Sequence, residues 1–154
     1  MPQPADVTIA PARDGDVPAW AALRQELWPD GVDEHRRELT TLLAQGSPER
    51  LALLATIGGD AVGLAEAAVR HDYVNGCDET PVAFLDGLYV APPWRRRGVA
   101  RRLVDRVAAW GRDAGCRAFA SNAPIGNDAS HALHRALGFA ETERVVFFRR
   151  ELAR

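Results

Sequence analysis

The chain has 154 residues, of which 47% are hydrophobic and 26% charged, and its formal net charge is −2. This length fits one globular domain over residues 1–154, and the composition excludes a disordered or fibrous protein. All 19 basic residues are arginine, which excludes a lysine Schiff base, a lysine nucleophile and a P-loop.

Hydropathy and the positions of the cysteines further limit the class of protein to which this chain can belong. The apolar runs are too short for a transmembrane helix, and the first residues lack the cationic and apolar regions of a secretory signal. Cys77 and Cys116 are far apart in the sequence, which favours two free thiols in a reduced, cytoplasmic protein. The four histidines and these cysteines have no zinc-type spacing, so we expect no metal site.

Periodicity and turn residues predict an alternation of strands and helices. Gly58-Gly59-Asp60 predicts a hairpin turn between two strands. Pro92-Pro93 predicts the end of strand 82–90, because proline cannot donate a hydrogen bond to a sheet. The predicted elements in chain order are strand 7–10, a helix capped by Asp14 or Asp16 that runs to about residue 27, helix 33–45, strands 51–57, 61–69 and 82–90, helix 98–114, strand 116–121, helix 127–137 and a final strand or bent pair of strands over 139–150. This order predicts an α/β fold with a mixed central sheet flanked by helices on both faces.

The junction between strand 82–90 and the next helix is rich in arginine. Arg95, Arg96 and Arg97 precede Gly98 and Ala100, small residues that let a ligand approach the backbone closely. The first backbone amides of a helix lack intrahelical acceptors and therefore attract anions. The guanidinium group of arginine can also donate two parallel hydrogen bonds to a phosphate. The junction therefore indicates a pyrophosphate site; the alternative is a solvated basic turn.

Two motifs carry a resemblance to a known family. Arg95-x-x-Gly98-x-Ala100, after a strand ending at residues 88–90, resembles the coenzyme A-binding motif of the GCN5-related N-acetyltransferases (GNAT). A second family motif, N-x-x-A-x-x-L-Y-x-x-x-G-F, is matched between Asn127 and Phe139. In that match Ser130 stands for the alanine and His134 for the tyrosine. Both motifs in this order imply the GNAT fold and acetyl-CoA as co-substrate.

A narrower resemblance covers about residues 20 to 150. The chain is similar to the aminoglycoside 6′-N-acetyltransferases in segments 23–24, 27–29, 71–77, 84–87, 136–139 and 141–145. This resemblance implies acetyl transfer to the 6′-amine of an aminoglycoside by direct attack in a ternary complex, with antibiotic resistance as the result. It also implies a homodimer and no acyl-enzyme, so the two cysteines are not needed.

The resemblance also implies residue roles on the acceptor side. Asp86 would hold the protonated amine and accept its proton, directly or through water; the alternative is binding by charge alone. Asn122 stands where close relatives carry an aspartate, which puts the acceptor range in doubt. The residues implied to bind the acceptor are Trp28, Tyr73, Asp86, Asn122 and Glu143; the alternatives are a core role for Trp28 and a surface charge at Glu143.

On the donor side, the backbone amides of residues 88–90 would hold the pantetheine arm and stabilise the oxyanion. His134 would protonate the departing thiolate, or else pack beside coenzyme A. The residues implied to bind the cofactor are Leu88, Tyr89, Val90, Arg95, Arg96, Arg97, Gly98, Val99, Ala100, Asn127, Ser130 and His134.

Charge placement supports an anionic donor and a cationic acceptor independently. Residues 66–90 hold five carboxylates against one arginine, whereas residues 91–120 hold eight arginines against two carboxylates. Such runs also occur on solvated faces. Three other functions remain open at this point: acetylation of another amine such as a polyamine or protein N-terminus, a non-catalytic coenzyme A module, and a nucleic-acid binder. The last is disfavoured by the net charge of −2.

Overall fold

The computed structural model describes residue 3 and residues 6–154, which fall into two compact units, Met1–Asn122 and Ala123–Arg154. No helix among these described residues is both long and apolar enough to cross a membrane. The first unit contains β1 (Thr8–Pro11), the 3-10 turn η2 (Asp14–Asp16), α1 (Val17–Leu27), α2 (Val32–Gln45), β2 (Arg50–Ile57), β3 (Asp60–Arg70), β4 (Val82–Val90), η3 (Pro92–Trp94), α3 (Val99–Asp113) and β5 (Ala118–Ser121). The second contains α4 (Asp128–Ala136).

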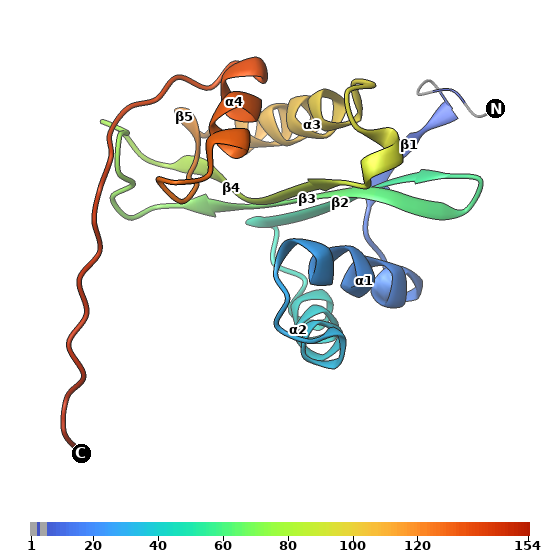
Figure 1. Ribbon diagram of the computed structural model, residues 1–154, viewed down its shortest axis with the longest axis horizontal. Helices are drawn as coiled ribbons and strands as arrows, with labels where there is room; N and C mark the ends of the chain where they lie inside the picture. Colours follow the sequence, from blue (N-terminus) through green and yellow to red (C-terminus); the bar gives the residue numbers. More distant parts are fainter. Residues whose placement is uncertain (1–2, 4–5) are drawn as a thin grey trace. The chain divides into compact units, whose positions relative to one another are not determined.

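The first unit is built on a five-stranded sheet with the order β1-β2-β3-β4-β5. The first four strands are antiparallel to their neighbours, and β5 runs parallel to β4 after the α3 crossover. Helices α1 and α2 cover one face of the sheet, and α3 covers the other (Figure 1). The predicted mixed α/β architecture is thus confirmed, with element ends shifted by a few residues.

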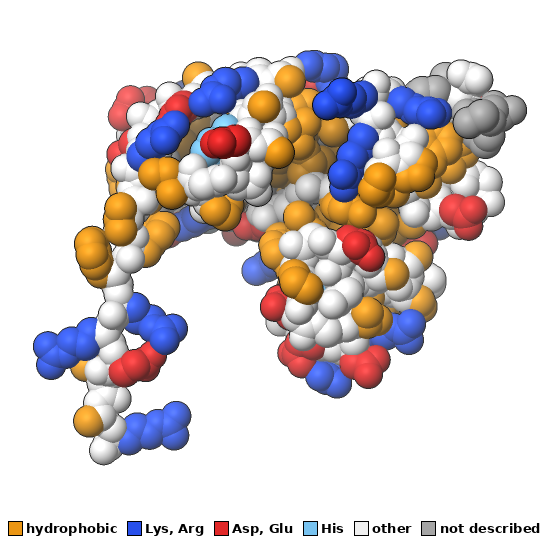
Figure 2. Space-filling view, in the orientation of Figure 1, with side chains coloured by type: hydrophobic (Ala, Val, Ile, Leu, Met, Phe, Trp, Pro, Cys, Tyr) orange, Lys and Arg blue, Asp and Glu red, His pale blue; other side chains and the backbone are white. Residues whose placement is uncertain are grey.

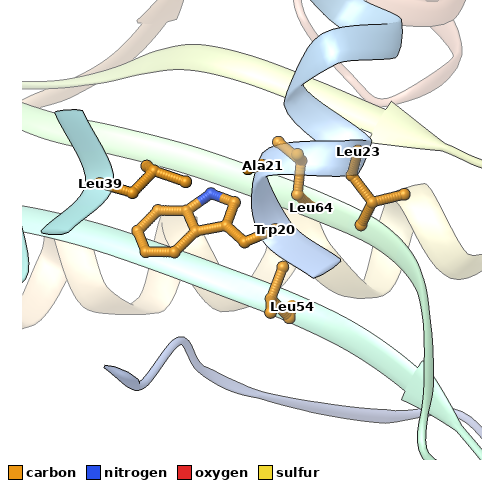
Figure 3. Packing of buried hydrophobic residues seen from close by; sticks show 6 residues of the cluster. All are labelled: Trp20, Ala21, Leu23, Leu39, Leu54 and Leu64. Carbon is orange, nitrogen blue, oxygen red and sulfur yellow. The ribbon is translucent and has the colours of Figure 1, made fainter. Parts of the chain in front are cut away.

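The core beneath α1 and α2 is a cluster of large apolar side chains. Trp20 and Leu23 of α1 meet Leu39 of α2 and Leu54 and Leu64 of the sheet, as Figure 3 shows. Trp20 is 2% exposed, and Leu39 and Leu64 are fully buried. Each such side chain contributes about 1.5–3 kcal/mol through burial. This cluster fixes α1 relative to β3.

Strand β4 has two irregularities that create open backbone. Glu66 is opposite Gly87 and Ala67 is opposite Leu85, so Asp86 is the extra residue of a β-bulge. On its other side β4 pairs with β5 from Val82 to Leu85, and this pairing ends where Leu85 is opposite Ser121. Bulges redirect side chains and are frequent beside active sites. The bulge and the strand separation occur at the same level of the sheet.

The second unit differs from its prediction. Helix α4 forms as expected, and the Asn127 side chain caps it by accepting a hydrogen bond from the Ser130 amide. The predicted strand 139–150 is wrong for the single chain: residues 139–154 contain no helix or strand. Their β-favouring sequence has no neighbouring strand in the described part of this chain, and a strand without a partner is not stable in water.

The close packing of α3 on β4 leads to the first prediction. A Cβ atom at Gly111 would stand 2.8 Å from the Cβ of Ala83. Alanine normally stabilises a helix interior relative to glycine, but here Gly111→Ala is expected to destabilise by about 1–3 kcal/mol through overpacking. Urea denaturation measures the difference, and a variant at least as stable as the original chain would contradict this packing.

Candidate active site

A recess of about 540 Å³ opens on the α1–α2 side of the sheet. Trp28 and Asp86 lie in its wall together with charged residues of both signs from α1, α2, β2 and β3. Three arginines (Arg24, Arg50, Arg70) are balanced there by the carboxylates of Glu38, Glu49, Glu66 and Asp86. The recess is therefore mixed in charge, whereas the count over residues 66–90 predicts an acidic excess.

Asp86 differs from the other carboxylates of the recess. Glu38 and Glu66 contact Arg24, and Glu49 lies 2.7 Å from the His71 ring. Asp86 forms no hydrogen bond or ion pair with any described residue. Its side chain reaches solvent from the bulge, yet partial desolvation in the recess raises its pKa. A carboxylate without a direct partner and with a perturbed pKa, in a concave site, is a candidate functional group.

Trp28 lies beside this carboxylate. Its ring packs on Gly87, where a Cβ atom would stand 2.5 Å from the edge of the indole. Only glycine allows this close approach. Trp28 is half-buried, so part of its ring faces the recess. The structure thus brings together two predicted acceptor residues, the indole and the carboxylate.

The other three predicted acceptor residues are placed differently. Tyr73 is 69% exposed in the loop after β3 and does not line the recess. Asn122 is exposed and directly follows Ser121, the last residue of β5, where β4 and β5 separate. Its amide carries no charge to hold a cation. Glu143 is exposed in the extended segment of the second unit.

Sequence reasoning missed the buried ion pair beneath the recess. Arg24 and Glu66 are 6% and 8% exposed, and the guanidinium binds both carboxylate oxygens at 2.8 Å. The signal was available, because Glu66 interrupts an otherwise apolar central strand, and a buried charge requires a partner.

The carboxyl half of β4 provides an open backbone edge. Residues 86–90 have β3 on one side but are beyond the part of β4 that pairs with β5. This segment includes Leu88, Tyr89 and Val90, predicted to bind the acyl carrier. Arg95 donates from Nε to the Val90 carbonyl at 2.8 Å, and its guanidinium stacks 5.5 Å from the Tyr89 ring centre. Its side chain therefore braces the turn, which the phosphate prediction did not anticipate.

The start of α3 has the geometry of an anion site. Gly98 caps the helix with φ +85°, a left-handed conformation that favours glycine, and a Cβ there would meet no protein atom. Arg96 also has a positive φ, and Arg97 stacks on Trp94. Val99 is 1% exposed, so only its backbone can serve a ligand. Arginine side chains gather over this end of α3 (Figure 2). Ala100 is half-buried.

In the second unit, two predicted cofactor residues form a local pair on α4. The Nδ1 atom of His134 lies 2.7 Å from the Ser130 carbonyl oxygen and 3.3 Å from its hydroxyl. Because a carbonyl only accepts, Nδ1 carries a hydrogen in this arrangement. The ring also packs edge-on against Phe139 at 5.4 Å. In the part of the chain that the structure describes, no group of His, Cys, Asp or Glu could hold a metal ion.

Comparison with known proteins decides the family. The profile of the Acetyltransferase (GNAT) family matches residues 20–139. The chain belongs to the GNAT family.

Two curated GNAT relatives are similar over nearly their whole length. Both are named aminoglycoside N(6′)-acetyltransferase type 1. The protein of Stenotrophomonas maltophilia is 50% identical over 94% of this chain and 94% of its own. That of Acinetobacter baumannii is 45% identical over 95% of this chain and 99% of its own.

Solved structures of similar proteins have nearly the same fold as this chain. The 6′-N-acetyltransferase AAC(6′)-Ih from Acinetobacter baumannii has a TM-score of 0.90 and 44% identity, covering 96% of this chain and 99% of its own. AAC(6′)-Iy in complex with the bisubstrate analogue CoA-S-monomethyl-acetylneamine has a TM-score of 0.88 and 41% identity, covering 95% and 99%. The resemblance stated from the two motifs is confirmed at the level of family and fold.

The raised pKa of Asp86 predicts a stability effect in this GNAT chain. A carboxyl whose pKa is higher in the folded state opposes folding when ionised, so its ionisation lowers stability above its ordinary pKa of 3.8. Asp86→Asn is therefore expected to be more stable than the original chain at pH 7. The difference shrinks as the pH falls through the raised pKa and vanishes below 3.8.

Urea midpoints of both proteins at pH 7 and near pH 4 measure this difference. The matched control is Asp60→Asn at the exposed first residue of β3, which should change stability by less than about 0.5 kcal/mol. An Asp86→Asn protein less stable than the original at pH 7 would refute the assigned desolvation.

Proposed function

We propose that this protein is an aminoglycoside 6′-N-acetyltransferase that transfers acetyl from acetyl-CoA to the 6′-amine by direct attack in a ternary complex. The observation that carries the proposal is the unpartnered carboxylate of Asp86, which lies beside Trp28 at the level where β4 becomes open. The names of the curated relatives and the bisubstrate complex of AAC(6′)-Iy support the substrate class.

On the acceptor side, Asp86 pairs with the protonated amine and accepts its proton, directly or through water, before the amine attacks. A general base of this kind contributes roughly 10²–10⁴-fold to rate. Trp28 offers an apolar ring with a negative face, which suits an amino sugar. Asn122, Tyr73 and Glu143 are also assigned to binding the acceptor, and Asn122 supplies a hydrogen bond in place of a charge.

On the donor side, the chain's own groups bind acetyl-CoA in two places. The open backbone of Leu88 to Val90 holds the pantetheine arm and donates to the thioester oxygen as it becomes negative. The first amides of α3 and the side chains of Arg96 and Arg97 face the pyrophosphate, while Arg95 holds the turn in shape.

His134 is assigned to protonate the thiolate of coenzyme A. With Nδ1 donating to the Ser130 carbonyl, the neutral ring has no hydrogen on Nε2. Nε2 therefore donates a proton only when the ring is an imidazolium ion. Asn127 holds the first turn of α4 through the Ser130 amide, and so orients the segment that carries this histidine.

Several wider properties belong to the same proposal. Residues 1–154 are assigned to one catalytic domain, because the family match at residues 20–139 runs across the boundary between the two units. A cytoplasmic location agrees with the two free cysteines and with a donor found inside cells. Acetylation removes a cationic amine from the antibiotic, so expression should confer resistance.

The decisive experiment is thiol release from acetyl-CoA with kanamycin, with spermine and a peptide tested in parallel. Turnover is expected with kanamycin. Asp86→Asn should lower kcat/KM for kanamycin by roughly 100-fold or more, because it removes the base, while the Kd for coenzyme A stays unchanged.

The exposed carboxylate of Asp60 again provides the control, since Asp60→Asn should retain full activity. Turnover on spermine or on the peptide without turnover on any 6′-amino aminoglycoside would replace the leading proposal with the alternative of another amine. Unaltered kinetics in Asp86→Asn across the pH range would remove Asp86 from the base role.

We further propose a homodimer in which the extended C-terminal segment pairs with a second copy. Residues 139–154 have no strand partner in the described part of the chain, and Phe147 and Phe148 are 85% and 93% exposed. Figure 2 shows hydrophobic side chains that stand open to solvent along the segment. A contiguous exposed apolar run of this kind marks an interaction site, and the β-favouring sequence 139–150 fits strand addition to another chain.

Light scattering on the purified protein measures the oligomer. The full chain is expected to be a dimer, and a chain ending at Ala140 should be a monomer because it lacks the apolar run. Arg149→Gln, which alters only an exposed charge near that run, should remain a dimer. A monomeric full chain, or a dimer unaffected by the truncation, would overturn this assembly.

A further inference from the structure

A network of buried polar side chains lies directly beneath the acceptor recess. Arg24 of α1, His35 of α2 and Glu66 of β3 are 6%, 2% and 8% exposed. They lie against the apolar cluster of Trp20, which itself donates from Nε1 to Glu66 at 3.1 Å. No buried side-chain polar atom among the described residues lacks a hydrogen-bond partner. A buried polar network in which every group is hydrogen-bonded holds its side chains rigidly in a single arrangement.

The guanidinium of Arg24 joins the network to Trp28. Its Nε and Nη2 atoms donate to the two oxygens of Glu66, and Nη1 lies 3.0 Å from the Glu38 carboxylate. The edges of the guanidinium are thus held by two acidic residues. The guanidinium also lies over the Trp28 ring, with 5.2 Å between its carbon and the ring centre. Arginine, unlike lysine, makes both kinds of contact at once.

His35 holds the backbone of the same tryptophan. Its Nε2 atom lies 2.6 Å from the Trp28 carbonyl oxygen. A carbonyl only accepts, so Nε2 is the donor, and Nδ1 of the neutral ring is left to accept from Arg24 Nη1 at 3.5 Å. Trp28 is the first residue beyond α1 and has an extended backbone. Arg24 therefore fixes its ring and His35 fixes its main chain.

The fixed ring forms a wall of the proposed acceptor site. It packs against Gly87, next to Asp86 in the sequence and in the recess. The charges that face Asp86 come from each neighbouring element: Arg24 from α1, Arg50 from β2, and Glu66 and Arg70 from β3. The arginine fork neutralises Glu66, the acidic residue among them. The network thus acts on both acceptor-binding groups: Arg24 and Glu66 are nearly buried where they line the recess, and His35 is not part of its lining.

We propose that Arg24, His35 and Glu66 are positioning residues that hold Trp28 against Gly87 beside Asp86 and thereby set the affinity for the amine substrate. The inference rests on the proposed acetyltransferase function, since it assigns Trp28 and Asp86 to the acceptor. It predicts that the network affects the acceptor and not acetyl-CoA. If the ion pair served stability alone, its removal would not change the affinity for one substrate more than for the other.

Two variants separate the backbone tether from the ion pair. His35→Leu removes the hydrogen bond to Trp28 and leaves every charge in place. The double variant Arg24→Met/Glu66→Gln removes both buried charges together, keeps an acceptor for Trp20 and avoids an unpaired buried ion. In both, KM for kanamycin is expected to rise about tenfold, the loss typical of one misplaced contact. KM for acetyl-CoA should change less than about twofold.

The exposed Arg37 on α2, which pairs with Glu34, supplies the matched control. Arg37→Gln should leave both KM values unchanged. If either test variant fails to fold, Arg24→Lys replaces it, because lysine keeps the charge but loses the fork and the stacking. Equal increases in both KM values, or no increase in either, would overturn the proposal.

A second measurement does not depend on catalysis. The indole N–H resonance of Trp28 is assigned in the substrate-free protein by its loss in Trp28→Phe. It should shift in His35→Leu and in the double variant, while the resonances of Trp94 and Trp110 stay in place. A Trp28 resonance unmoved in both variants would refute the positioning role. Absence of turnover with every aminoglycoside would refute the proposed function. The Trp28 resonance would still show whether the network positions this ring.

Discussion

Strand β4 is paired on both sides only as far as Leu85, and the functional geometry of the molecule depends on that limit. Up to this residue the strand is an interior member of the sheet, with its hydrogen bonds satisfied by β3 and β5. Beyond it one edge is open, and an open edge is normally a liability that proteins cover. Here the edge begins at the residue where a bulge brings an aspartate to the surface. Two adjacent irregularities, the bulge opposite β3 and the end of pairing with β5, therefore supply an exposed carboxylate and a line of backbone donors.

The sheet tolerates this interruption because the opposite side is well fixed. Pairing of β3 with β4 continues past the bulge to Val90, and the buried side chains of α1, α2 and β3 hold that face in place. The unusual component is the charged pair inside this layer. Burying two ions seldom adds stability over apolar residues of similar volume, so its presence agrees with a requirement for geometry rather than for folding free energy.

Most of the architecture could be predicted from the sequence because its signals are local. Proline and glycine marked the ends of β4 and α3, and apolar spacing marked the buried row of α3, with Leu103 and Val107 fully buried. The arginine-glycine junction was predicted from its local chemistry as well as from a family motif, and Asp86 was predicted from the resemblance. The Arg24–Glu66 pair was missed because its members are 42 residues apart and no local pattern links them. The segment 139–150 was assigned a strand from its composition, but a strand also requires a neighbour, which composition does not reveal.

The brace formed by Arg95 has a consequence for the choice of donor. By joining the turn to the Val90 carbonyl, it makes the open edge of β4 and the beginning of α3 parts of one rigid frame. The span between these two places is then constant, and a molecule that uses both must bridge it with an arm of matching length. A compact acyl donor without such an arm gains contacts at one end only. We therefore expect the protein to favour activated acyl compounds whose arm is long enough to contact both places.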